Sequence, residues 1–171
     1  MKKIKLFLAL FLFGAIVFAQ SPAKHFKNGK AYYRSAAYKH AIISLSSAIK
    51  AKQDNDKALN LRGLCYEAIG DYKNAALDFQ KALVFEEKEA EYHSNLGRAY
   101  FYLEEYEKAI ASLKIALDRD KKIMPAYAYK LKAHMALSQF EAASRVGQEA
   151  VAKEKSAATY YNFGIALDSL S

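Results

Sequence analysis

Residues 71–83 read DYKNAALDFQKAL, and residues 105–117, which begin 34 positions later, read EYEKAIASLKIAL. Both stretches have Tyr at their second position, Ala at their fifth and twelfth positions and Leu at their end, while most other positions differ. Their apolar residues recur three and four positions apart, which is typical of one face of an α-helix. A helical pattern is therefore repeated after 34 residues.

The same interval relates equivalent residues along most of the chain. The repeated positions are Gly29, Gly63 and Gly97; Tyr32, Tyr66 and Tyr100; Tyr38, Tyr72, Tyr106 and Phe140; Ala41, Ala75, Ala109 and Ala143; and Ala48, Ala82, Ala116 and Ala150. Small residues let paired helices approach closely, and an aromatic ring next to each small position fills the wedge between neighbouring pairs. Because one helix pair is too small to bury its own apolar face, the pattern predicts a stack of pairs with a continuous core.

Breaks in the helical pattern divide the chain after Ser21 into about nine short helices, and alternating strand patterns are absent from the sequence. The predicted breaks lie near Ala36, Gln53–Asn55, Gly70–Asp71, Glu87–Lys88, Glu104–Glu105, Arg119–Lys122, Ser138 and Lys153–Lys155. We therefore expect an all-α fold.

These residues resemble the tetratricopeptide repeat family, whose 34-residue unit has Gly followed by Tyr in its first helix and spaced Ala residues in its second. The resemblance implies a right-handed α-solenoid over residues 22–171. Its units would span 22–55, 56–89, 90–123 and 124–156, with a partial unit or helix at 157–171. The fourth unit departs from the pattern with Leu131 in the Gly position, His134 in the Tyr position and Gly147 in a large apolar position, so we expect it to be packed more loosely.

The first residues, MKKIKLFLALFLFGAIVFAQ, have the layout of a secretory signal peptide. Three Lys precede an apolar run from Leu6 to Ala19, and small residues stand before Gln20. The run is short for a membrane anchor, which remains the alternative. We expect residues 1–19 to be removed, leaving a periplasmic or extracellular protein of the cell envelope with no stable membrane span.

Composition and motifs argue against several classes of function. Removing the leader would lower the formal net charge of +8 by three, and the remaining charges of both signs are interleaved, which favours solvated helix faces over nucleic-acid binding. No phosphate loop, nucleophile motif or helical zinc motif is present in the sequence. The single Cys, Cys65, aligns with Ala residues and is expected to be buried. We therefore predict a protein that is not an enzyme and has no catalytic residue, cofactor or metal site.

In the family that the chain resembles, the first helices line an inner groove that commonly holds an extended peptide or a partner helix. By position, the groove residues here would be Phe26, Lys30, Tyr33, Arg34, Lys57, Asn60, Leu64, Arg98, Phe101, Tyr102 and Lys132, with Glu67, Glu91, Ser94, Ala128 and Met135 beside them. Basic and aromatic side chains in this set favour an acidic or carboxyl-terminal segment of a partner protein. Phe26 and Leu61 occupy two positions where the family members that clamp chaperone carboxyl termini use Lys and Asn, which argues against that role.

Two other functions remain open at this point. The chain could be an accessory module or a fragment of a larger envelope protein or enzyme, because the last helix stops at Ser171, where earlier units turn into their second helix. It could also form homo-oligomers through that last helix, whose Tyr160, Tyr161 and Phe163 make it rather apolar.

Overall fold

The computed structural model describes residues 21–156, 161 and 164, and within them the chain forms eight complete α-helices and no β-strand. The helices are α2 (Pro22–Arg34), α3 (Tyr38–Ala51), α4 (Asp56–Ala68), α5 (Tyr72–Phe85), α6 (Ala90–Tyr102), α7 (Tyr106–Arg119), α8 (Met124–Ala136) and α9 (Phe140–Lys153). The predicted leader and all of the predicted last helix except Tyr161 and Gly164 lie outside the described residues.

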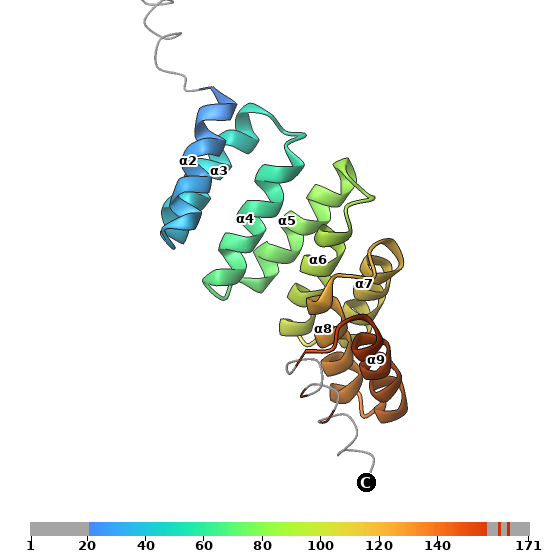
Figure 1. Cartoon of the computed structure of the whole chain (residues 1–171). Helices are drawn as coiled ribbons and strands as arrows, with labels where there is room; N and C mark the ends of the chain where they lie inside the picture. The colour runs from blue at the N-terminus through green and yellow to red at the C-terminus, as the bar shows by residue number, and fades with distance from the viewer. Residues whose placement is uncertain (1–20, 157–160, 162–163, 165–171) are drawn as a thin grey trace, which may run out of the picture.

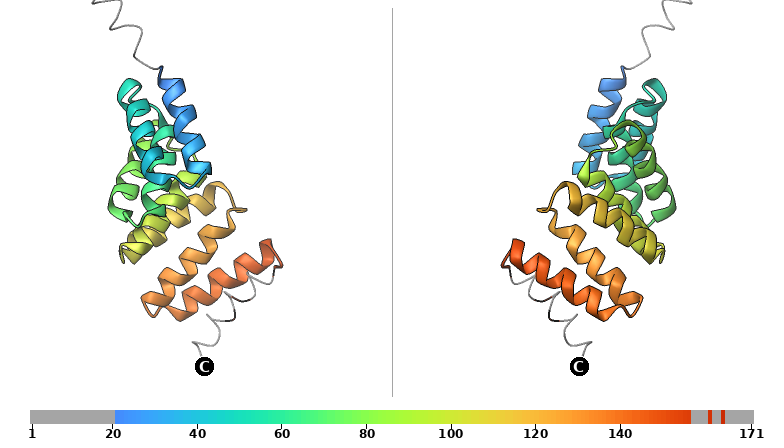
Figure 2. Two further views of the ribbon diagram at one scale, coloured as in Figure 1. Left: turned by 90° about the vertical axis from the view of Figure 1, so that its left-hand side faces the viewer. Right: turned by 90° about the vertical axis from the view of Figure 1, so that its right-hand side faces the viewer.

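The helices form a stack of consecutive antiparallel pairs that runs from α2 and α3 at one end to α8 and α9 at the other (Figure 1). The first helix of each pair begins 34 residues after the previous one, and so does the second helix. Figure 2 shows that the stack twists, so the last pair lies at a marked angle to the first. The all-α solenoid predicted from the repeat is confirmed. None of the described helices is both long and apolar enough to cross a membrane.

Close approach between the two helices of each pair explains the repeated Gly. A Cβ atom added to Gly29 would lie 2.5 Å from Cγ of Leu45, and one added to Gly63 would lie 2.6 Å from the ring of Phe79. The third pair repeats this contact between Gly97 and Leu113. Fully buried Ala residues complete the interface; they are Ala41, Ala48, Ala75, Ala82, Ala109 and Ala116. Tyr66 and Tyr100 pack against the core, but Tyr32 is 41% exposed and its ring lies tilted against that of His40, so the wedge-filling prediction is wrong for Tyr32.

The fourth pair keeps a buried core with the large and small positions exchanged. In the first three pairs, the Gly of the first helix faces a large residue sixteen positions later. The same register relates Leu131 to Gly147, and both are buried. A continuous cluster of buried residues extends from α7 through α9 and includes Leu131. The two helices of this pair nevertheless approach each other less closely along their length than those of the first three pairs, as expected where Leu131 replaces the Gly.

The turn between the helices of every pair contains one residue in the left-handed conformation. These residues are Ala36, Gly70, Glu104 and Ser138, with φ angles of 56°, 81°, 61° and 56°. Each turn closes with the same two hydrogen bonds; in the second pair, Gly70 N–H donates to the Glu67 carbonyl and Asp71 N–H donates to the Tyr66 carbonyl. Only Gly70 can adopt this conformation without a steric cost from Cβ.

Substituting Gly at the other left-handed positions should stabilise the fold. We expect Ala36→Gly and Glu104→Gly each to raise the free energy of unfolding by about 0.5–1 kcal/mol, because they relieve the steric cost. Urea denaturation would measure the change. Ala111→Gly is the control, since Ala111 is exposed in the middle of α7, where Gly should cost about 0.5–1 kcal/mol. Equal changes in stability for Ala36→Gly and Ala111→Gly would contradict the prediction.

A charged network ties α3, α4 and α5 together inside the stack. The Arg62 guanidinium donates to both carboxylate oxygens of Asp78, at 2.6 Å and 2.7 Å, and to Oγ of Ser46 at 2.8 Å. The Asp78 side chain is 4% exposed and that of Arg62 is 16% exposed. The hydrogen bond to Asp78 raises the pKa of Arg62, although burial opposes it. This pair is therefore a shielded ion pair that the sequence analysis did not detect.

Cys65 is completely buried, as predicted, and burial raises the pKa of its thiol to about 11. The thiol of the unfolded chain loses its proton near its ordinary pKa of 9. Burial of the neutral Cys65 thiol should therefore stabilise the fold fully below pH 9, and this stabilisation should be lost as the pH rises to about 11. We expect wild type to lose up to roughly 2 kcal/mol more than Cys65→Ala between these pH values. Urea midpoints measured from pH 7 to 11 would test this, and parallel curves would contradict it.

Candidate functional site

Two adjoining hollows lie along the first helices of the units, where the sequence analysis placed the groove. The amino-terminal hollow has a volume of about 480 Å³ and is lined by Phe26, Lys30, Tyr33, Arg34, Lys57, Asn60, Leu61, Leu64, Glu89, Glu91 and Tyr92. The middle hollow has a volume of about 270 Å³ and is lined by Tyr33, Leu64, Glu67, Ala68, Tyr72, Arg98 and Tyr102. Tyr33 and Leu64 belong to both, so the two hollows form one groove across α2, α4 and α6.

Most of the predicted groove residues are brought together in this way. Phe101 and Lys132 line neither hollow. Phe101 instead packs edge-on against Tyr102 and Tyr129, and the Lys132 ammonium lies 5.4 Å from the centre of the Tyr129 ring. These two residues therefore belong to an aromatic cluster that continues beyond the middle hollow onto α8.

The amino-terminal hollow is lined by charged side chains of both signs. Lys30 and Arg34 come from α2 and Lys57 from α4, and no acidic side chain in the described part of the chain forms an ion pair with them. Glu89 and Glu91 line the same hollow from the start of α6, which packs against α4. The floor between them is apolar, with Phe26, Leu61 and Leu64. The Lys30 ammonium lies 5.6 Å from the centre of the Phe26 ring.

The middle hollow has an ion pair in its floor and tyrosines in its walls. Arg98 Nε lies 2.5 Å from Oε1 of Glu67, and its Nη2 donates to Oε2 of the same carboxylate at 2.7 Å. Burial disfavours the charge of Arg98, but the hydrogen bond to Glu67 raises the pKa of Arg98 overall. Arg98 therefore already has a carboxylate partner, contrary to its predicted role as a cation available to a ligand.

Amide groups extend this network between α4 and α6. Asn95 Nδ2 donates to Oδ1 of Asn60 at 3.0 Å, and the Arg98 guanidinium donates to Oδ1 of Asn95 at 3.2 Å. Ser94, which was predicted to face the groove, is 4% exposed and lines neither hollow. The neighbouring Asn95 makes the polar contacts instead, and it fixes Asn60 and Arg98 relative to each other.

Stacked tyrosines form one wall of the middle hollow. The rings of Tyr72 and Tyr102 are 4.5 Å apart and nearly parallel, at 11°, and the Tyr102 hydroxyl is 3.0 Å from that of Tyr129. Burial and the hydrogen bond to Tyr102 raise the pKa of Tyr129 to about 12. Tyr72 begins α5, the second helix of its unit, whereas the predicted groove residues came from first helices only. Its place in the repeated aromatic column suggested only a packing role.

His93, a possible metal ligand by residue type, is buried and contacts the backbone. His93 is 8% exposed, and its Nε2 lies 2.9 Å from the Glu87 carbonyl oxygen. In residues 21–156, 161 and 164, no group of three or more His, Cys, Asp or Glu side chains could hold a metal ion.

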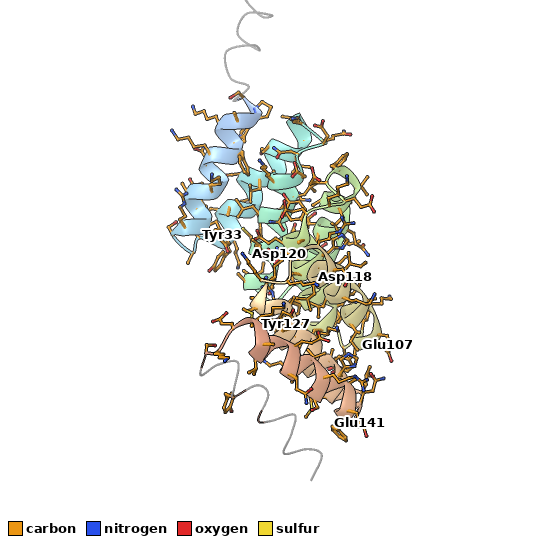
Figure 3. All side chains as sticks on the ribbon, turned by 45° about the vertical axis from the view of Figure 1, so that its right-hand side comes forward. Tyr33, Glu107, Asp118, Asp120, Tyr127 and Glu141 are labelled. Carbon is orange, nitrogen blue, oxygen red and sulfur yellow. The ribbon has the colours of Figure 1, made fainter. Side chains whose placement is uncertain are left out.

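A third hollow of about 520 Å³ lies between α7, α8 and α9, where four Lys surround Tyr127, Asp118 and Glu149. Figure 3 shows Tyr127 and Asp118 in this part of the stack, away from Tyr33.

Comparison with known families identifies the repeat. Two family models described as tetratricopeptide repeat match residues 26–92 and 90–123, which together are more than half of the chain. The chain belongs to the tetratricopeptide repeat family. A comparison with curated protein sequences finds no significant match.

Solved tetratricopeptide repeat proteins share the fold at low sequence identity. A crystal structure of MamA protein is 21% identical, with a TM-score of 0.81 over 86% of this chain and 81% of the other. The first repeat domain of Spaghetti (RPAP3), bound to the HSP90 peptide SRMEEVD, is 21% identical, with a TM-score of 0.67 over 70% of this chain and 95% of the other. A repeat protein from Parabacteroides merdae ATCC 43184 is 18% identical, with a TM-score of 0.76 over 87% of this chain and 59% of the other.

Proposed function

We propose that this protein is a non-catalytic scaffold that holds an extended, acidic segment of a partner protein in the groove formed by the two hollows. The observation that carries the proposal is a set of three cations, Lys30, Arg34 and Lys57, which lie beside an apolar floor in the amino-terminal hollow and form no ion pair with any residue that the structure describes. Cations supply complementarity to carboxylates, and the apolar floor supplies contact area. The fold is typically a protein-interaction scaffold, and a structural neighbour holds an acidic peptide.

The chemistry of the groove favours carboxylates on side chains over a clamped chain terminus. Phe26 and Leu61 contribute apolar surface to the amino-terminal hollow, at two positions where a terminal clamp would need Lys and Asn. The three cations are spread over α2 and α4. We therefore expect an internal acidic segment to bind at least as well as a free carboxyl terminus.

A displayed library of random peptides provides a direct test. Wild-type protein should enrich peptides with more acidic than basic residues, and their affinity should fall by about tenfold or more in the variant Lys30→Glu, Arg34→Glu, Lys57→Glu. The matched control is Lys27→Glu, Lys39→Glu, Lys73→Glu, which makes the same change of charge at exposed positions outside both hollows. Failure to enrich any peptide, or equal losses in the two variants, would refute the proposal.

We also propose that residues 1–19 direct export, so that the groove works in the cell envelope or outside the cell. The support is the order of three Lys, an apolar run and small residues at the start of the sequence. Expression of the whole chain in bacterial cells should yield protein that begins at Gln20, as measured by amino-terminal sequencing. Recovery of only the uncleaved chain would contradict cleavage and favour an anchored leader.

Self-association is a second candidate, for which Tyr161 gives a specific motive. This side chain is 71% exposed beyond the end of α9, and large exposed aromatics are enriched at protein interfaces. Light scattering over a range of concentrations should show a mass that increases with concentration, and Tyr161→Ser should reduce the increase. A strict monomer would contradict this candidate and leave the groove proposal intact.

A further inference from the structure

The groove is continuous but chemically divided, and this division constrains the sequence of its ligand. Tyr33 and Leu64 line both hollows, so a segment that lies over Leu64 beside Tyr33 enters both of them. Neighbouring first helices of such a stack are separated by roughly 10 Å. An extended chain spans this distance in about three residues.

The cations that remain available to a ligand lie in the amino-terminal hollow. Lys30, Arg34 and Lys57 have no ion-pair partner in the described part of the chain, whereas Arg98 in the middle hollow forms an ion pair and a hydrogen bond with Glu67. A carboxylate in the middle hollow would compete with Glu67 for Arg98 and leave one of the two carboxylates unpaired. An acidic ligand side chain therefore fits the amino-terminal hollow and not the middle one.

The middle hollow instead suits a neutral ring. Tyr33, Tyr72 and Tyr102 line it, and the last two rings are stacked. The Tyr33 hydroxyl makes no hydrogen bond within residues 21–156, and burial raises the pKa of Tyr33, so the phenol can donate to a ligand carbonyl. Segments with the polyproline II conformation dock in aromatic-lined grooves, where they present rings to the aromatic side chains and keep their backbone carbonyls free to accept hydrogen bonds.

We infer that the groove selects an extended segment in which an acidic residue and a proline lie about three positions apart, with the acidic side chain in the amino-terminal hollow and the proline ring in the middle hollow. This inference rests on the proposed peptide-binding function. It adds the proline as a second requirement for binding, beside the acidic residue that the cations favour.

The test uses the same random peptide library and then synthetic peptides made from the enriched sequences. The enriched pool should contain an acidic residue and a proline two to four positions apart. Replacing that proline by Ala should weaken binding to wild type at least about fivefold, and replacing the acidic residue by its amide should do the same. The effect of the proline should vanish in Tyr102→Ala, while the effect of the acidic residue should vanish in Lys30→Glu.

Matched controls separate loss of contact from loss of fold. Tyr32→Ala removes a tyrosine that is 41% exposed, against 42% for Tyr102, and lies outside both hollows. Lys27→Glu changes an exposed residue on the same helix as Lys30. Both controls should bind like wild type, and circular dichroism should show the same helix content in all variants. Tyr33→Phe keeps the ring and should weaken binding only by the loss of the hydroxyl.

The outcomes distinguish the two proposals. If no peptide is enriched, the proposed function fails and the inference fails with it. If acidic peptides are enriched without proline, or with aromatic or aliphatic residues in its place, the proposed function stands and the inference is overturned. Proline-containing peptides that bind Tyr102→Ala as tightly as wild type would also overturn it, because the ring would then lie elsewhere.

Discussion

Replacing Arg62 by Met is expected to lower the free energy of unfolding by about 3–5 kcal/mol. The Asp78 carboxylate is 4% exposed and accepts two hydrogen bonds from Arg62, so the substitution leaves a buried charge without its partner. Ser46 loses its contact with the guanidinium at the same time. Urea denaturation followed by circular dichroism would measure the loss.

The double variant Arg62→Met, Asp78→Leu is the control for this prediction. Replacing both members of a buried ion pair with apolar residues of similar size is often neutral or stabilising, so the double variant should regain most of the lost stability. A loss below about 1 kcal/mol in Arg62→Met would show that water reaches Asp78. Equal losses in the single and double variants would show that the cost comes from packing instead of the unpaired charge.

The exchange of large and small residues in the fourth pair predicts strong coupling between positions 131 and 147. Leu131→Gly should cost about 3–5 kcal/mol, because it leaves a cavity in the core and places another Gly in a helix. Gly147→Leu should cost about 1–3 kcal/mol through overpacking. The double variant restores the arrangement of the first and third pairs, so we expect it to lie within about 1 kcal/mol of wild type.

Urea denaturation of the four proteins in this cycle would measure the coupling. Gly147→Ala is a useful control, because a small side chain should be tolerated better than Leu. Losses that simply add in the double variant would contradict the prediction. They would show that positions 131 and 147 do not share one space, despite the register seen in the other three pairs.

The helices and their order could be predicted from the sequence because the information that defines them is local. The first three units repeat Gly, Tyr and Ala at fixed positions, and the fourth keeps the Ala residues. The breaks predicted near Ala36, Gly70, Glu104 and Ser138 coincide with the four left-handed turns. The groove residues on α2 and α4 followed from the register of the first helices. Lys30, Tyr33 and Leu64 line the hollows as that register suggests.

Contacts between units were harder to predict. Arg98 and Glu67 are 31 positions apart, and their pairing depends on how α6 sits against α4, which helical spacing alone does not define. The Arg62 and Asp78 pair has the same sixteen-residue separation as Gly63 and Phe79, so comparing charges at that separation could have found it. Tyr72 was assigned only to packing because an aromatic column explained it. The export prediction concerns residues outside the described range.

The order of contacts in the stack has a mechanical consequence. In the described part of the chain, each helix packs only against helices one or two places away in sequence. A force that separates the two ends of such an array is not resisted by any clamp between distant segments, and helix pairs can detach one after another. The protein should therefore extend gradually under tension, as a spring does, and recoil as the pairs dock again. A partner held across α2, α4 and α6 would bridge three successive pairs and make that part of the spring stiffer.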